Sequence, residues 1–458
     1  MKMPRISSRI ALMLLFALLL PILAACGGAP EVSTPTQPPA TTGGAPTAAK
    51  PTAAPPTSAP TSAPTSIPTA AAQATSAPEA TTPAGNGVTG PLKTPYLEFG
   101  VVAHLYYTDR SRVLTLANNA GFDWVRQQIV WKDVEGPAPG QYAWGELDNI
   151  VNDTAAHNVK LLVNIVQAPS FYTPDGQNGL PSDPKSLGNF VEALMTRYGN
   201  KINAVEIWNE QNLAHENGGH VTPEDAGHYV DILVECYNRI KAISPATFVL
   251  AGAPSSSGVN DPALAVSDEN YYHAMYSYQN GLIKNHFDAQ AVHPGGSANP
   301  PDTLYPDQPY QVEGCPAALG SCWTDDPTFY FRHVENVRKF MDEEGVGDHQ
   351  IWITEYGWAT KNNTPGYEFG NFVSNQQQAD YIAGAIKRAY DKYRYPDGST
   401  WVGAMFLWNL NFAVLWGGQG NPEHEQASFG ILNPDWSPRP SFDAVQGLIA
   451  QLKKKQDR

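Results

Sequence analysis

The sequence predicts an α/β fold, and within that class a (β/α)8 TIM barrel that occupies residues 93–458. Eight short apolar runs alternate there with amphipathic segments of helical length. Most runs are apolar throughout, which is typical of parallel strands that are covered on both faces. No Gly-x-Gly-x-x-Gly or Walker-type loop follows a run, so a closed barrel is favoured over the alternative, an open doubly wound sheet.

The amphipathic segments have recognisable starts. Thr222 and Asp326 are each followed by proline, and these are the residue types of an N-cap and a first helical position. Ser374 precedes a long helix expected to end near residue 393, and Ser441 opens the last helix, expected to end near residue 455. The expected strands cover residues 99–105, 124–129, 160–166, 204–208, 248–252, 289–293, 351–354 and 402–408.

The N-terminus has the pattern of a targeting signal. Lys2, Arg5 and Arg9 form a basic head before an apolar stretch, residues 10–25, which is short for a membrane span. The stretch runs into Leu-Ala-Ala-Cys-Gly, which resembles the bacterial lipobox. We therefore expect residues 1–26 to be a lipoprotein signal, Cys26 to be lipidated, and the protein to be anchored outside the cytoplasm on the bacterial cell membrane. The alternative is an ordinary cleavage site with an incidental cysteine.

Residues 27–92 consist mainly of Pro, Thr, Ala and Ser, with almost no aromatic or large aliphatic side chains. Such a segment buries too little apolar surface to offset the loss of conformational entropy on ordering. We expect a disordered linker with polyproline II character, which connects the lipid anchor to the barrel.

Charge and cysteine content limit the classes of partner. The formal net charge of −15 argues against nucleic acid and suits a secreted enzyme with a neutral substrate. Cys315 and Cys322 lie in a loop rich in Gly and Pro and are expected to form a disulfide, whereas Cys236 falls in an apolar helical pattern and is expected to be a buried thiol. No Cys/His spacing resembles a zinc site. We expect a monomer with no metal and no organic cofactor.

Two glutamates stand where expected strands end. Glu210 follows the fourth strand and Glu355 follows the seventh. A carboxylate in such a place loses hydration, and this free-energy cost is accepted only where the group has a partner or a function. Because barrel active sites form at the carboxyl ends of the strands, both acids are expected at one mouth. A protonated carboxyl and an ionised carboxylate are the groups that cleave a glycosidic bond. The alternative is a structural ion pair that caps the two strands.

The sequence around these glutamates resembles clan A glycoside hydrolases. Residues 208–213, Trp-Asn-Glu-Gln-Asn-Leu, are similar to the Trp-Asn-Glu-Pro-Asn-Leu form of the family 39 β-xylosidases, and more loosely to family 5 cellulases. Segments 131–142 and 429–440 resemble those that follow strands 2 and 8 in the clan. The resemblance implies a retaining enzyme on a (β/α)8 barrel, in which Glu210 is the acid/base and Glu355 is the nucleophile.

The same resemblance implies roles for further residues in binding the carbohydrate substrate. The matching positions are an arginine that supports the nucleophile, an asparagine that contacts the sugar, a histidine on strand 6 and a tryptophan beneath the −1 subsite. The alternatives are a plain salt bridge for the arginine, a core position for the histidine and packing alone for the tryptophan. In this sequence these residues are Arg126, Asn209, His293 and Trp408.

Two positions depart from the clan pattern. Gln211 replaces the usual proline, which should be tolerated because that residue shapes a turn. Gly295 stands where tyrosine is common after His293, so the hydroxyl that contacts the nucleophile is not assigned. Tyr356 is a candidate for it through its proximity to Glu355 alone. His104, at the end of the first strand, is a weaker candidate for substrate binding.

Aromatic residues in or near the loops of the catalytic face are candidates for stacking on sugars, although several are expected to belong to the core. No individual subsite is assigned to Tyr106, Trp131, Phe171, Tyr172, Trp358 or Trp416. The sugar, the linkage and endo or exo action stay open. Two alternative functions also remain, namely a catalytically silent carbohydrate-binding surface lipoprotein and a transglycosylase.

Overall fold

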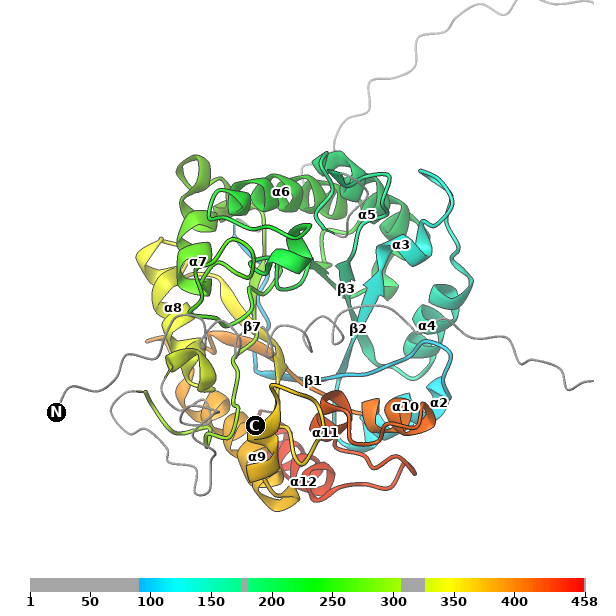
Figure 1. The fold of residues 1–458 in the computed structure, drawn as a ribbon, viewed down its shortest axis with the longest axis vertical. Coiled ribbons are helices and arrows are strands. Elements are labelled where there is room, and N and C mark those ends of the chain that lie inside the picture. The colour runs from blue at the N-terminus through cyan, green and yellow to red at the C-terminus, as the bar shows by residue number, and fades with distance from the viewer. Residues whose placement is uncertain (1–89, 175–178, 306–325, 457–458) are drawn as a thin grey trace, which may run out of the picture. The chain divides into compact units, whose positions relative to one another are not determined.

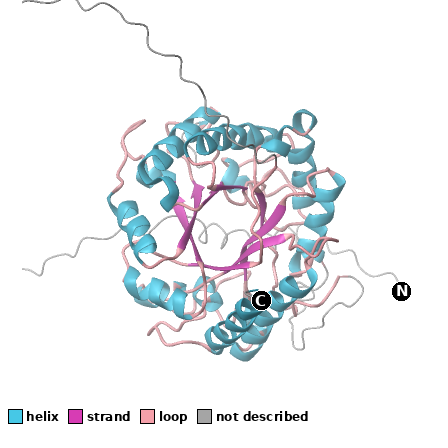
Figure 2. Ribbon diagram, turned by 180° about the vertical axis from the view of Figure 1, so that it is seen from behind, coloured by secondary structure: helices cyan, strands magenta, loops and turns pink. Residues whose placement is uncertain are grey.

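The computed structural model describes residues 90–174, 179–305 and 326–456. Eight parallel strands pair in chain order and close into a barrel, which confirms the predicted (β/α)8 architecture and excludes the open sheet. Helices surround the ring of strands (Figures 1 and 2). The strands are β1 Glu98–Val102, β2 Trp124–Val130, β3 Lys160–Val166, β4 Ala204–Ile207, β5 Phe248–Ala251, β6 Ala289–Val292, β7 Gln350–Tyr356 and β8 Val402–Leu407.

Each strand overlaps one of the expected runs. The β7 strand extends further than expected and includes Glu355, which was expected to follow it. The helices are α2 Arg110–Asn119, α3 Trp131–Val134, α4 Gly145–Ala156, α5 Pro184–Tyr198, α6 Asp225–Ile243, α7 Asp268–Ser277, α8 His333–Glu343, α9 Asn375–Lys392, α10 Phe412–Gly418, α11 Glu425–Phe429 and α12 Pro440–Gln456.

The helix starts agree only partly with the expectations. Ser374 caps α9 in a capping box, as its position predicts. Thr222 does not cap α6, because its N–H and hydroxyl both donate to the carboxylate of Asp225, and the helix begins only at that residue. Asp326 caps a short 3-10 turn, Pro327–Phe329, and α8 begins after it.

The barrel interior is filled by side chains whose character changes along the barrel axis. At the amino ends of the strands lies an apolar cluster that includes Trp124, Trp352 and Phe406. The Trp124 and Trp352 rings are 5.2 Å apart in an edge-on arrangement. Two residues further along their strands, Arg126 and Thr354 point into the same interior and form polar contacts. The charged layer therefore lies towards the carboxyl ends, where barrel active sites form.

The pairing of β7 with β8 contains an irregularity that matters for the site. Three steps along β7, from Ile353 to Tyr356, match two steps along β8. The extra residue is a bulge, and bulges re-aim side chains. Thr354 and Glu355 consequently both reach the barrel interior, although side chains on a regular strand alternate between its faces.

Several sequence expectations lie outside the described residues. These are the signal segment with Cys26, all but the end of the linker, and the pair Cys315 and Cys322. Cys236 is described, and it is a buried free thiol on α6, as predicted. In the described part of the chain, no helix combines the length and the apolar character needed to cross a membrane.

Candidate active site

Glu210 is placed by an unusual turn after β4. Trp208 and Glu210 both adopt left-handed backbone conformations, with φ of 68° and 50°. Such values are uncommon for residues with a side chain, and they cluster at functional sites. Two hydrogen bonds hold the turn: Asn164 Nδ2 donates to the Trp208 carbonyl at 2.8 Å, and the Glu210 N–H donates to the Ala253 carbonyl at 2.8 Å. The neighbouring strands β3 and β5 thus fix the direction of the Glu210 side chain.

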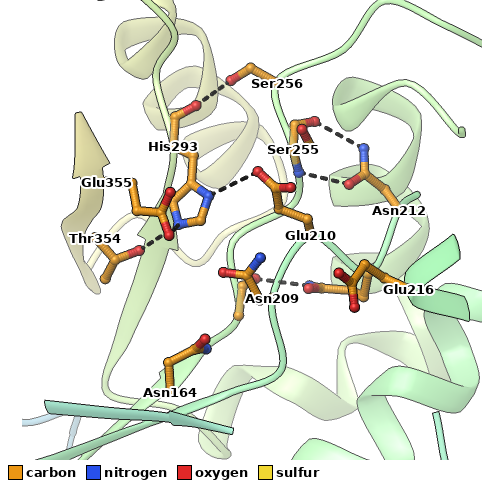
Figure 3. Close-up of polar contacts among 12 residues, drawn as sticks. Asn164, Asn209, Glu210, Asn212, Glu216, Ser255, Ser256, His293, Thr354 and Glu355 are labelled. Carbon is orange, nitrogen blue, oxygen red and sulfur yellow. Dashed lines mark hydrogen bonds and ion pairs between the residues drawn. The ribbon is translucent and has the colours of Figure 1, made fainter. Parts of the chain in front are cut away.

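The residues after Glu210 hold the same turn from the other side. The Gln211 side-chain amide donates to the Gly252 carbonyl at 2.8 Å, so this residue stabilises the turn where the resembling enzymes have proline. Asn212 Nδ2 donates to the Ser255 carbonyl at 2.9 Å, and its Oδ1 accepts from the Ser255 N–H at 2.7 Å. The loop after β5 is therefore joined to the loop that carries Glu210 (Figure 3).

Arg126 lies at the centre of the polar layer. It is fully buried, and its three donor groups reach Glu206 at 2.7 Å, Glu355 at 2.6 Å and the Asn209 side-chain oxygen at 2.9 Å. Burial alone would lower the pKa of Arg126, but the charges of Glu206 and Glu355 raise it above its usual value. Arg126 thus connects Glu355 with Asn209, the residue next to Glu210, through one fixed cation.

His293, which directly follows β6, lies between the two candidate catalytic acids (Figure 3). Its Nδ1 is 3.2 Å from Glu210 Oε1, and its Nε2 is 3.9 Å from Glu355 Oε1. The Nε2 atom also lies 3.0 Å from the Thr354 hydroxyl. One imidazole therefore contacts both carboxylates, so the two acids share a single site at the mouth of the barrel.

The charges of this cluster shift two pKa values in opposite directions. Burial raises the pKa of Glu210, but the hydrogen bond and charge of His293 bring it below its usual value. Burial lowers the pKa of His293, but the carboxylates of Glu355 and Glu210 bring it above its usual value. A proton held by the pair in the free site is therefore favoured on the imidazole.

Glu206 and Thr354, which were not among the candidate residues, complete the network. The Thr354 hydroxyl donates to Glu206 Oε1 at 3.0 Å, and Glu206 accepts from Arg126. Glu206 lies two residues after Ala204, which belongs to the inner apolar cluster, so the alternation of side chains along β4 directs both into the barrel. Thr354 faces the site because of the bulge in β7, which has no evident sequence signal.

Tyr356 does not lie where the sequence suggested. It returns to the outer face of β7 and packs in the large hydrophobic cluster, 6.1 Å from the Phe331 ring. In the described part of the chain its hydroxyl makes no hydrogen bond to Glu355. The reason is the bulge, which directs Glu355 inwards and the next side chain outwards.

Trp408 and His104 lie on the β8 and β1 side of the mouth. The Trp408 ring is half-buried and lies 4.9 Å from the Phe412 ring. The His104 backbone exchanges two hydrogen bonds of 2.9 Å with the Asn411 side chain, and burial lowers the pKa of His104 to about 4. His104 is thus a neutral imidazole at neutral pH, and it contacts neither candidate acid in the described structure.

A further buried carboxyl lies near Glu210. Glu216, in the turn after β4, is 3.4 Å from the ring of His215, and its side chain is 4% exposed. Burial raises the pKa of Glu216, with a smaller contribution from the charge of Glu210. Glu216 was not among the candidate residues, because it lies beyond the motif, in a short 3-10 helix. In the described residues, no group of three or more His, Cys, Asp or Glu side chains is arranged to hold a metal ion.

No protein-family model and no curated protein sequence matches this chain. Solved structures share its fold. One is a family 39 glycoside hydrolase from Bacteroides cellulosilyticus WH2, with a TM-score of 0.53, 18% identity, and 78% of this chain and 64% of that chain covered. A glucosidase from Croceicoccus marinus gives a TM-score of 0.52 and 15% identity, with 79% and 69% covered. GH5_18 from Streptomyces cattleya gives a TM-score of 0.50 and 14% identity, with 79% of this chain and 81% of that chain covered.

These similarities establish the fold. The chain spans less than two thirds of the family 39 structure, 64% of its length.

Proposed function

We propose that the protein is a retaining glycoside hydrolase that cleaves β-glycosidic bonds in oligosaccharides or polysaccharides by double displacement. One observation carries the proposal: Glu210 and Glu355, 145 positions apart in the sequence (355 − 210), contact the same imidazole at the mouth of a closed barrel. Two carboxyl groups on either side of one sugar are the requirement for this reaction. The solved structures that share the fold include glycoside hydrolases, which agrees with the proposal.

Glu355 is the nucleophile in this proposal. Its carboxylate, 21% exposed and held by Arg126, attacks the anomeric carbon while the bond to the leaving oxygen breaks. Glu210 donates a proton to that oxygen, which leaves as an alcohol. In the second step Glu210 accepts a proton from water, and the water oxygen displaces Glu355 from the anomeric carbon. The product has the configuration of the substrate, and no metal or organic cofactor takes part.

The proton that Glu210 donates requires a source, because the pKa of Glu210 in the free site is below its usual value. A general acid must be protonated when substrate is bound. His293 supplies that proton through its contact with Glu210 Oε1 at 3.2 Å. Substrate excludes water from Glu210, and removal of water favours the neutral carboxyl over the charged one. The proton is then transferred from imidazole to carboxylate before the glycosidic bond breaks.

Glu216 is a less suitable acid than Glu210. Its raised pKa would suit a proton donor, but its side chain is only 4% exposed, whereas that of Glu210 is 13% exposed. Glu210 also contacts the imidazole that lies next to Glu355. We therefore assign the acid/base role to Glu210 and a neutral, structural role to Glu216.

The test is a panel of aryl β-glycosides and the polysaccharides xylan, β-glucan, mannan and galactan. We expect hydrolysis of at least one β-glycoside, and a first-formed product of β configuration in an NMR time course. Glu355→Gln should lose about 10⁴-fold or more in kcat on every substrate. Glu210→Gln should lose about 10²–10⁴-fold on substrates with poor leaving groups, and much less on dinitrophenyl glycosides, whose leaving group needs no proton.

Binding without release of sugar would contradict hydrolysis and support a silent carbohydrate-binding module. A first-formed α product would contradict the retaining mechanism. Transfer of the sugar to a second sugar in place of water would identify a transglycosylase.

We also propose that Cys26 is lipidated and anchors the protein on the outer side of a bacterial membrane, with residues 27–92 as the linker. The support is the sequence pattern alone. Radiolabelled palmitate should be incorporated by the full chain and not by Cys26→Ser. Equal labelling of the two would contradict the anchor.

A further inference from the structure

Two exposed aromatic side chains lie at the same end of the barrel as the catalytic acids. Tyr107, in the loop after β1, is 79% exposed, and Phe171, in the loop after β3, is 41% exposed. Strands β1 and β3 are the two neighbours of β2 in the barrel. Single exposed aromatics are common on protein surfaces, so exposure alone does not identify a site.

What distinguishes Tyr107 is that its exposed position is enforced. Its backbone is left-handed, with φ of 49°, which is an outlier for a bulky residue. The Tyr107 N–H donates to Glu146 Oε1 at 2.9 Å, and Arg110 forms an ion pair with the same carboxylate oxygen at 2.6 Å. Strain of this kind persists only where the surroundings fix it, and it is frequent where ligands are held.

Phe171 is also fixed, through a stack of rings. It lies edge-on to Tyr172 at 4.6 Å, and Tyr172 stacks on Trp131 of α3 at 5.2 Å. Glu135 holds this stack, because it accepts from the Tyr172 hydroxyl at 2.9 Å and from Trp131 Nε1 at 2.6 Å. The exposed ring therefore stands on a rigid base beside β2 (α3 in Figure 1).

We propose that Tyr107 and Phe171 bind sugar units of a glycan chain that extends beyond the unit held between Glu210 and Glu355. A rigid, amphipathic ring offers contact area at a low entropic cost, and the C–H face of a pyranose is the apolar surface that fits it. The inference rests on the proposed hydrolase function and specifies the substrate class as a glycan of several units.

The experiment compares Tyr107→Ala, Phe171→Ala and the double variant with wild type. Each enzyme is assayed on a 4-nitrophenyl β-glycoside that wild type accepts and on oligosaccharides of the same sugar in increasing length. We expect kcat/KM of wild type to rise with length. In the double variant the rise is lost, with about a tenfold or larger decrease on the longest substrate and a much smaller one on the aryl glycoside.

Tyr96→Ala is the matched control. Tyr96 is 54% exposed, but it precedes β1 and so lies at the opposite end of the barrel. This variant should keep the wild-type dependence on length. A rise with length that persists in the double variant, or equal losses on short and long substrates, would overturn the proposal.

If wild type hydrolyses no glycoside, the proposed function fails. Glycan binding by Tyr107 and Phe171 is then tested separately. In affinity gels that contain soluble xylan, β-glucan, mannan or galactan, at least one polymer should retard wild type, and the double variant should not be retarded. If no polymer retards wild type, or if wild type and the double variant are retarded equally, the proposed glycan binding by Tyr107 and Phe171 is overturned.

Discussion

The two halves of the barrel interior differ in composition and, we infer, in purpose. Towards the amino ends of the strands, the rings of Trp124, Trp352 and Phe406 pack with aliphatic side chains in an apolar cluster. Towards the carboxyl ends, Arg126, Glu206 and their partners form a charged network that buries polar groups at a cost in desolvation. The apolar half thus stabilises the fold, whereas the charged half gives up stability to position two acids.

Removal of the shared cation should have the largest effect, because Arg126 belongs to the charged half and is also fully buried. Arg126→Met leaves Glu206 as an uncompensated buried charge, which costs about 3–5 kcal/mol of unfolding free energy. It also removes the contact that orients Glu355, so kcat should fall by about 10²-fold or more. Urea unfolding and steady-state kinetics measure the two effects.

The double variant Arg126→Met with Glu206→Gln separates the two effects. It should regain much of the lost stability, because no unpaired charge remains at Glu206, but it should not regain activity. Recovery of activity together with stability would show that Arg126 acts only through the fold.

Trp352 tests the other half. The ring is fully buried and lies 4.9 Å from Phe248 and 6.1 Å from Phe406. Trp352→Ala should cost about 3–5 kcal/mol of stability through the cavity it creates. In the folded fraction kcat should stay within about twofold of wild type, because substitutions at sites that share no partners act independently.

Trp352→Phe refines this test. The Trp352 Nε1 atom is buried without a hydrogen-bond partner in the described structure. Replacement of the indole by a phenyl ring removes this unsatisfied donor and keeps most of the buried volume. Trp352→Phe should therefore cost clearly less stability than Trp352→Ala. A large fall in kcat with intact stability for either variant would contradict the division between the halves.

His293 is expected to control the pH dependence of the reaction. Its charge and hydrogen bond lower the pKa of Glu210, while burial acts in the opposite direction. In the free enzyme the proton of the pair is held by His293, whose pKa the carboxylates of Glu355 and Glu210 raise above its usual value. In His293→Ala only Glu210 can hold that proton, and a carboxyl releases it at lower pH than an imidazolium does. The alkaline limb of kcat/KM, which reports the free enzyme, should therefore move to lower pH.

His104→Ala is the control for that measurement. The pKa of His104 is about 4, so this imidazole carries no charge at neutral pH. Its removal should therefore leave the alkaline limb of kcat/KM in place. A limb that stays in place or moves up in His293→Ala, or that moves equally in the two variants, would contradict the role given to His293.

The smallest effect is expected at Glu216. If it is a neutral structural carboxyl, then Glu216→Gln preserves its shape and hydrogen bonding, and kcat/KM should change by less than about fivefold. Glu210→Gln should lose far more on the same substrate. A loss at Glu216 equal to that at Glu210 would make Glu216 the proton donor.

Periodicity and motif spacing predicted the barrel and the strands that carry the acids, because both depend on local residue patterns. The motif at residues 208–213 made Glu210 a candidate acid, and the second strand-end glutamate made Glu355 the other. The position of Tyr356 was not predictable in this way, since a bulge depends on the pairing of β7 with β8 and not on either strand alone. The place of Thr354 in the network depends on how the folded chain brings β2, β4 and β7 together around Arg126.

The most direct test of the account is to trap the intermediate. In a 2-deoxy-2-fluoro glycoside with a dinitrophenyl leaving group, fluorine slows both steps because it destabilises the oxocarbenium-like transition states. The good leaving group keeps the first step fast enough for the glycosyl-enzyme intermediate to accumulate. Mass spectrometry of the digested protein should then find one sugar on the peptide that contains Glu355. A sugar attached to Glu210, or hydrolysis of the parent glycoside with no trapped adduct, would contradict the assignment of Glu355 as the nucleophile.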